Sequence, residues 1–306
     1  MNKLRALLQL MRPANVITAH ADILAGAALA LGVEVLNTLP RGFAEEGLPR
    51  LLWLLLATTG LYGGGITLND FFDARLDARE RPERPIPSGR ISRAGAGTWG
   101  FGWLGIGIAA AFAASPASGF IACTTACLVI LYNAASKHHA FFGPLNMGLC
   151  RAGNLILGIS LVPDQVENFA WVGLVPVIYI GIITFVSRSE VTGGESRDTT
   201  IAAVLMGLFT GGLAILAFFI SLREPVTLLL LVPFLVLFGW RVIPPFIRAA
   251  QSPAPERIGA AVKAGVLSLI ILNSVLAAAG MGFLAGLLVL LLWPVSLGLA
   301  RIFAVT

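Results

Sequence analysis

The amino-acid sequence predicts an all-α integral membrane protein, a bundle of nine or ten transmembrane helices that forms a single membrane domain over residues 1–306. Two observations on composition and one on charge lead to this class. Hydrophobic residues make up 57% of the chain and charged residues only 12%, whereas soluble domains carry about 25% charged residues. The mean hydropathy is +0.86. Positive residues gather in every second loop, as topology requires of a polytopic protein.

Apolar segments long enough to cross a bilayer, which takes roughly 20 residues, recur along the whole chain. The basic N-terminus leads into the first of them, so we expect a first span there rather than a cleaved leader. Only Gly280, Met281 and Gly282 separate the last two segments, which leaves the count at nine or ten. The expected spans are 14–33, 51–70, 97–114, 118–136, 143–162, 168–187, 199–221, 226–246, 261–279 and 283–303.

Lysine and arginine counts predict the orientation of the chain. Three basic residues precede the first span and six lie in the 71–96 loop, while the loops of opposite parity hold few. Because cytoplasmic loops carry the excess of Lys and Arg, we expect the N-terminus and the polar motifs on the cytoplasmic side. The net charge of +5 follows this loop pattern and anionic lipid, so no nucleic-acid partner is predicted.

The most informative stretch follows the second span and begins with an acidic cluster. Asn69, Asp73 and Asp77 are four residues apart, with Asp70 beside them. On a helix the three would share one face, and their hard oxygen atoms suit Mg2+. Six arginines follow, and guanidinium groups fork onto the oxygens of a diphosphate: Arg75, Arg79, Arg81, Arg84, Arg90 and Arg93. The alternative is a solvated loop between spans, although carboxylates at a membrane boundary are costly unless they are used.

A second acidic cluster follows the sixth span, with Glu190, Glu195 and Asp198 as candidate metal ligands. A glycine pair between the two glutamates lets the backbone approach a ligand. Arg188 and Arg197 flank the acids and are candidate diphosphate ligands. The alternative is a polar turn between two spans.

Other polar residues lie at the ends of spans or inside them. Tyr132 and Lys137 end the fourth span, and each is either a phosphate ligand or an ordinary interfacial anchor. Arg151 lies in the fifth span, where a charge indicates a functional site unless it snorkels to the surface, and it is a candidate diphosphate ligand. Asn15, near the start of the first span, is a further candidate diphosphate ligand. Asp22 lies deeper in that span and needs a partner that the sequence does not single out.

These motifs together resemble those of the UbiA superfamily of intramembrane prenyltransferases. The first motif, running from Asn69 to Asp77 and followed by residues 81–92, carries most of the resemblance. Arg12-Pro13 before the first span, Tyr132 to Lys137, and Thr199 to Gly207 are also similar to that family. The resemblance covers most of the chain.

The resemblance implies a nine-helix bundle around a lipid-open cavity, with two acidic motifs that bind Mg2+ and a diphosphate. It implies metal binding by Asn69, Asp73 and Asp77, support from Asp70, and phosphate contacts from Arg84, Tyr132 and Lys137. We accordingly expect Asp70, Asp73 and Lys137 to be catalytic. The second motif departs from the family, because glutamates replace the usual aspartates. This departure is similar to the UbiA-like EboC type that is encoded with bacterial ebo clusters.

The predicted function is Mg2+-dependent transfer of an isoprenyl group from an isoprenyl diphosphate to a hydrophobic acceptor. An aromatic ring, a porphyrin-type alcohol and a glycerol-phosphate hydroxyl all remain open as acceptors. Phe71, Phe72, Trp99 and Trp103 are candidates to line the route of the prenyl chain. Two other functions stay open: an ion-coupled transporter, and an isoprenoid-binding or lipid-binding protein that has lost turnover.

Overall fold

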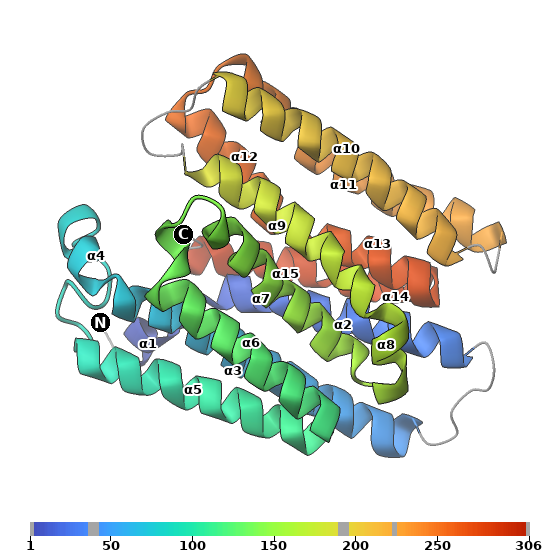
Figure 1. Ribbon diagram of the computed structural model, residues 1–306, viewed down its shortest axis with the longest axis horizontal. Helices are drawn as coiled ribbons and strands as arrows, with labels where there is room; N and C mark the ends of the chain where they lie inside the picture. Colours follow the sequence, from blue (N-terminus) through green and yellow to red (C-terminus); the bar gives the residue numbers. More distant parts are fainter. Residues whose placement is uncertain (1–2, 36–42, 189–195, 222–224, 304–306) are drawn as a thin grey trace.

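The computed structural model describes residues 3–35, 43–188, 196–221 and 225–303, and all the regular structure in these ranges is helical (Figure 1). The elements are α1 (Lys3–Met11), α2 (Pro13–Val35), the π-helix η1 (Phe43–Gly47), α3 (Leu48–Phe72), α4 (Ala74–Glu80), α5 (Arg93–Ala114), α6 (Pro116–Ala134), η2 (Ser136–His138), α7 (Phe142–Ile159), η3 (Pro163–Gln165), α8 (Val166–Phe169), η4 (Ala170–Gly173), α9 (Leu174–Ser187), α10 (Ser196–Ser221), α11 (Pro225–Gln251), α12 (Pro255–Leu267), α13 (Leu269–Met281), α14 (Phe283–Leu290) and α15 (Leu292–Ile302). The predicted all-helical membrane class is confirmed.

Nine helical segments of the described chain are long and apolar enough to cross a membrane. They are Pro13–Gly32, Glu45–Phe72, Arg93–Ala114, Pro116–Ala134, Pro163–Ser187, Ser196–Ser221, Leu228–Gln251, Pro255–Met281 and Phe283–Ile302. Each overlaps a segment expected from the sequence. The remaining expected segment, 143–162, corresponds to α7, which is 18 residues long and more polar because it carries Asn146, Arg151 and Asn154.

Helix α7 also runs through the bundle, packed between α2, α6 and α9 (Figure 1). Helix α1 and the end of α15 lie at the same end of the molecule as α4 (Figure 1). Together with α7, the nine segments overlap all ten segments expected from the sequence. Gly282, at a φ of +92°, separates the last two of them.

Helix α13 forms the centre of the core. All of its residues from Leu269 to Ala279 are buried, and it packs against α2, α11 and α14. A helix that is apolar around most of its circumference either lies in a core or faces lipid, and the neighbours of α13 place it in the core. Asn273 and Ser274 are its polar residues; the Asn273 side chain donates to Asp22 of α2, and the Ser274 hydroxyl donates to the carbonyl of Ile270.

Helices α3 and α5 pack with their backbones almost in contact. A Cβ atom on Gly107 of α5 would lie 2.8 Å from the carbonyl oxygen of Ala57 and from the amide nitrogen of Leu61, both on α3. A Cβ on Gly60 would meet the backbone of α5 in the same way. Small residues allow such close approach in membranes, where van der Waals contact drives helix association. This packing holds the end of α3, which carries the first acidic motif.

Candidate active site

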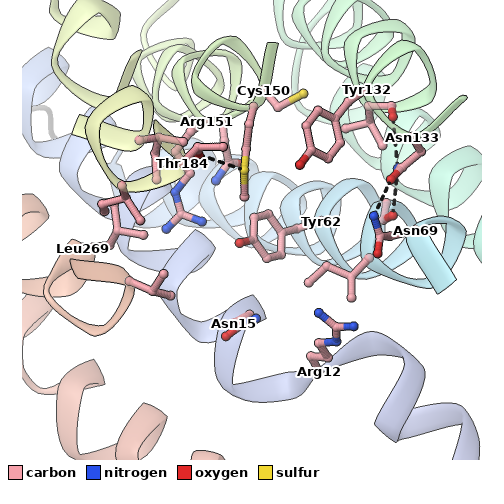
Figure 2. A pocket seen from close by; sticks show the side chains of 18 of the residues that line it. Arg12, Asn15, Tyr62, Asn69, Tyr132, Asn133, Cys150, Arg151, Thr184 and Leu269 are labelled. Carbon is pink, nitrogen blue, oxygen red and sulfur yellow. Dashed lines mark hydrogen bonds between the residues drawn. The ribbon is translucent and has the colours of Figure 1, made fainter. Parts of the chain in front are cut away.

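A cavity of about 490 Å³ lies inside the bundle between α2, α3, α6, α7, α9, α12 and α13. Much of its wall is apolar, with Leu61, Ile66, Val129, Ile180 and Leu269 among the lining residues. Figure 2 shows the polar residues that face it. A volume of this size suits a small organic ligand or a part of a longer chain.

The charged groups that line the cavity are all basic among the residues that the structure describes. They are Arg12, Arg81, Arg84, Arg151 and Lys263. Asn15, Asn69, Tyr132 and Asn133 add further polar groups to the wall. A mainly apolar pocket that contains guanidinium groups favours an amphiphilic anion.

The first acidic motif lies at the junction of α3 and α4. Helix α3 ends at Phe72, and Asp73 has φ −84° and ψ 2° before α4 begins at Ala74. The hydrogen bonds nevertheless continue across the junction, since the Asp73 amide bonds to the Asn69 carbonyl and the Asp77 amide to the Asp73 carbonyl. The expected helical spacing therefore holds, with one local distortion at Asp73.

Two carboxylates of the motif pair with arginines that line the cavity. Asp70 accepts from Arg12 at 2.9 Å and from Arg84 at 3.4 Å, and Arg84 also donates to both oxygens of Asp77 at 2.9 and 3.0 Å. Burial lowers the pKa of Arg12 from its usual value, and the Asp70 carboxylate opposes that shift. A guanidinium group keeps its charge in proteins, so Arg12 is a cation beside the cavity. The pairs hold the arginine side chains in place beside the cavity.

The other two residues of the motif bond to the end of α6 and the turn after it. Lys137 donates to Asp73 at 2.5 Å. Asn69 donates to Asn133 at 3.0 Å, and Asn133 donates in turn to the carbonyl oxygens of Gly65 and Val129. Tyr132, next to Asn133, lines the cavity (Figure 2).

The chemistry of the first motif fits a hard divalent cation. Asn69, Asp73 and Asp77 offer amide and carboxylate oxygens, which are the ligands that Mg2+ prefers. The charge that a metal would balance is balanced here by Lys137 and Arg84. No group of three His, Cys, Asp or Glu side chains comes close enough to hold a metal ion within the described ranges.

The second motif is described only in part. Glu190 and Glu195 lie outside the described residues, so their predicted role as metal ligands stays a prediction. Asp198 is half-buried in the first turn of α10. Arg188 and Arg197 are exposed and do not line the cavity, and Arg188 donates to the carbonyl of His139 at 2.5 Å.

The predicted site residues outside the second motif divide into two sets. Asn15, Asn69, Arg84, Tyr132 and Arg151 line the cavity. The other residues of the first motif and its surroundings support the lining residues or lie beside them: Asp70, Asp73, Asp77 and Lys137.

The aromatic residues named as candidates for the prenyl route lie outside this cavity. Phe71, Phe72, Trp99 and Trp103 do not line the cavity, because they pack in edge-on pairs where α5 covers the outside of α3. Tyr62 lines it instead. A single tyrosine in the middle of an apolar span is a weak signal, and only the packing of α3 shows which way it points.

Asp22 has a definite partner in the structure. Its carboxylate lies 2.7 Å from Nε of Arg151 and accepts hydrogen bonds from Asn154 at 2.9 Å and from Asn273 at 2.6 Å. These contacts join α2, α7 and α13. Asn154 and Asn273 follow Asp22 by 132 and 251 residues along the chain, which is why sequence spacing did not reveal these contacts.

Fold and site together define a polytopic helical membrane protein with a largely apolar cavity whose charged side chains are basic and can bind an anion. The UbiA prenyltransferase family model matches residues 23–190, more than half of the chain, and the chain therefore belongs to that family. As a member of it, the protein is an intramembrane prenyltransferase, and the predicted family and enzyme class are confirmed.

Curated relatives are enzymes of archaea. The chain is 27% identical over 213 residues to the digeranylgeranylglyceryl phosphate synthase of Methanoregula boonei, covering 67% of this chain and 69% of the relative. It is 29% identical over 194 residues to the enzyme of the same name from Ignicoccus hospitalis, covering 63% and 59% of the two. The chain thus matches between about half and two thirds of the length of several of these relatives.

Solved structures have the same fold. A digeranylgeranylglyceryl phosphate synthase structure has a TM-score of 0.63 at 17% identity, covering 92% of this chain and 99% of its own. A UbiA homologue from Archaeoglobus fulgidus, bound to GPP and Mg2+, has a TM-score of 0.62 at 17% identity, covering 90% and 98%. At this identity the comparison establishes the fold.

Proposed function

We propose that the protein transfers an isoprenyl group from an isoprenyl diphosphate to the hydroxyl of a lipid-like acceptor with a phosphorylated glycerol head, and that it requires Mg2+. One observation carries this proposal: a largely apolar cavity in which Arg12, Arg81 and Arg84 stand beside the acidic motif. Arginine forks bind a diphosphate, and the apolar wall suits a prenyl chain.

The donor diphosphate binds at the end of the cavity that contains Asn69, Arg84 and Tyr132. Asn69, Asp73 and Asp77 would hold Mg2+ there, joined by Glu190, Glu195 and Asp198 of the second motif. When bound, the metal supplies positive charge to the departing diphosphate. Lys137 lies against Asp73 and adds a cation at the same place. Arg188 and Arg197 are candidates to reach the diphosphate from the far side.

The reaction breaks the bond between the allylic carbon and the diphosphate oxygen and forms a bond from that carbon to the acceptor oxygen. Negative charge develops on the leaving diphosphate, and preorganised donors stabilise it most where water is excluded. Arg12 and Arg84 are preorganised because Asp70 and Asp77 hold them. The acceptor hydroxyl loses its proton to the departing diphosphate as the new bond forms. The apolar wall keeps water from capturing the allylic carbon.

The names of the relatives support one of the three acceptor types that the sequence leaves open. The curated relatives are named digeranylgeranylglyceryl phosphate synthases, and this supports a glycerol-phosphate type of acceptor for the present chain. The donor is supported by solved UbiA homologues bound to GPP or DMAPP together with Mg2+.

The test is binding of geranyl, farnesyl and geranylgeranyl diphosphates to the purified protein, with and without Mg2+. We expect saturable binding that chelation abolishes and that Asp73→Ala weakens at least tenfold. Asp164→Ala is the matched control, because Asp164 is an exposed acid in η3, remote from the first motif in the fold. Binding of none of the donors would overturn the proposal, and binding without product formation on any acceptor would favour a non-catalytic isoprenoid-binding protein.

A further inference from the structure

A second polar centre in the cavity wall is built around Arg151 of α7. Its Nε pairs with Asp22 at 2.7 Å, and its Nη2 donates to the carbonyl oxygen of Thr18 at 2.6 Å and to the Thr18 hydroxyl at 3.1 Å. Asn154 and Asn273 complete the shell of Asp22. All of these side chains are buried. The guanidinium group is thus held on two sides by the protein.

The third nitrogen of Arg151 has no such contact. Nη1 is buried and has no hydrogen-bond partner among the described residues, although the side chain is only 4% exposed and lines the cavity. The ring of Tyr62 stacks on the guanidinium group at 5.1 Å and limits its movement. A buried charged donor without a partner is costly, so such a group indicates a missing ligand.

This centre lies apart from the diphosphate end. Figure 2 shows Arg151 and Asn69 on opposite sides of the cavity, with Tyr62 between them. The diphosphate end already has Arg12, Arg81 and Arg84. An arginine beyond Tyr62 is therefore available for a different anion.

The remaining charge on the cavity wall favours an anion as well. Asp22 neutralises Arg151, but the exposed Lys263 of α12 also lines the cavity and restores a positive balance. A guanidinium donor and an ammonium group suit a phosphate monoester, since arginine supplies directed hydrogen bonds and lysine a mobile point charge. The apolar residues of the cavity wall leave room for the rest of an amphiphile.

We propose that Arg151, held by Asp22 and assisted by Lys263, binds the phosphate monoester of the acceptor lipid, at a subsite distinct from the donor diphosphate site. The inference rests on the proposed function and deepens it. It replaces the role of diphosphate ligand that sequence analysis suggests for Arg151. Anchoring the acceptor by its phosphate leaves its hydroxyl to point toward the donor end.

The test compares two probes by equilibrium binding to the purified protein: a monoprenyl glycerol phosphate ether and the same ether without phosphate. We expect the wild-type protein to bind the phosphate at least tenfold more tightly. Because Arg151→Gln alone would leave Asp22 unpaired, the main variant is Asp22→Asn with Arg151→Gln. It should reduce the preference for the phosphate to less than threefold. Arg151→Lys should keep part of the preference.

The donor site is measured separately with a non-hydrolysable prenyl thiolodiphosphate, and the double variant should bind it as the wild type does. Ser160→Ala is the matched control for loss of a buried polar group, since Ser160 caps the end of α7, bonds to Ser118 and does not line the cavity. It should leave both affinities unchanged.

Three outcomes would overturn the inference. The wild type would bind both ethers equally, or the double variant would keep the full preference while folded, or it would lose affinity for the thiolodiphosphate instead. If the wild type binds the phosphate ether selectively but binds no thiolodiphosphate, the proposed function is contradicted. The phosphate subsite at Arg151 would still be supported by that result.

Discussion

At the scale of single residues, the charges at the donor end of the cavity are arranged in pairs. Arg84 forms ion pairs with both Asp70 and Asp77, and Asp70 forms a second ion pair with Arg12. Charged hydrogen bonds of this kind fix the direction of a guanidinium group more than they add net stability. The arrangement is therefore suited to holding arginine forks ready for an anion.

Replacing Arg84 with Gln tests this arrangement. We expect affinity for the isoprenyl diphosphate to fall about 10-fold to 100-fold, because charged hydrogen bonds contribute about 1.5–3 kcal/mol each. The measurement is donor binding in the presence of Mg2+. Arg75→Gln is the control, since Arg75 is an exposed arginine of the same motif that does not line the cavity. Equal losses in both variants would mean that the motif acts through its overall charge.

Replacing Asp22 with Ala tests the buried pair. Leaving Arg151 unpaired in the core should lower the free energy of unfolding by about 3–5 kcal/mol. The double change Asp22→Ala with Arg151→Leu should cost less, because no buried charge is left over. Thermal unfolding in detergent measures both, and a double variant less stable than the single one would show that the pair contributes more than mutual neutralisation.

At the scale of elements, the close packing of α3 against α5 positions the acidic motif. Gly60 and Gly107 allow the two backbones to touch, so a methyl group added at either position would overlap the backbone of the other helix. Helix α7 is positioned by polar contacts instead of by close backbone packing alone. It carries the buried polar residues Arg151 and Asn154 inside the bundle.

A pair of glycine substitutions in α5 distinguishes packing from helix propensity. Gly107→Ala should destabilise the protein by about 1–3 kcal/mol, because its Cβ would lie 2.8 Å from the backbone of α3. Gly105→Ala should be neutral or stabilise by up to about 1 kcal/mol, since nothing lies within 4 Å of that position. Midpoints of thermal unfolding provide the comparison, and a similar loss in both variants would argue against close packing as the cause.

At the scale of the whole molecule, the acidic motif and the ends of the chain share one end of the bundle (Figure 1). The excess of Lys and Arg in the loops leads us to propose that this end is cytoplasmic. Such a placement would supply the donor diphosphate and Mg2+ from the cytoplasm, while the acceptor lipid comes from the bilayer.

Labelling of single cysteines tests the orientation in a variant whose own cysteines at 123, 127 and 150 are replaced by Ala. Ser88→Cys lies in the exposed loop before α5, and Asp164→Cys lies in the connection between α7 and α9. In intact cells a membrane-impermeant maleimide should react with Cys at 164 and reach position 88 only after lysis. The reverse pattern would place the active site on the outer side.

The residue sequence alone determined the membrane class, the span positions and the first acidic motif with its arginines. These follow from local properties, namely runs of apolar residues, loop charge and four-residue spacing, which hold whatever the packing. Spans two and six, four spans apart, end in acidic residues at 69–77 and 190–198, and this echo predicts a weak internal duplication. It stays a prediction, because Glu190 and Glu195 lie outside the described residues.

Only the tertiary structure decided which side chains meet. It paired Asp22 with Arg151, brought Tyr62 and Lys263 to the cavity, and turned Phe71 and Trp103 away from it. The Asp22–Arg151 pair joins residues more than a hundred positions apart, and all of these placements depend on how each helix is rotated about its axis. In a helix that is apolar on every face, the sequence carries almost no signal for that rotation, and packing against its neighbours sets it.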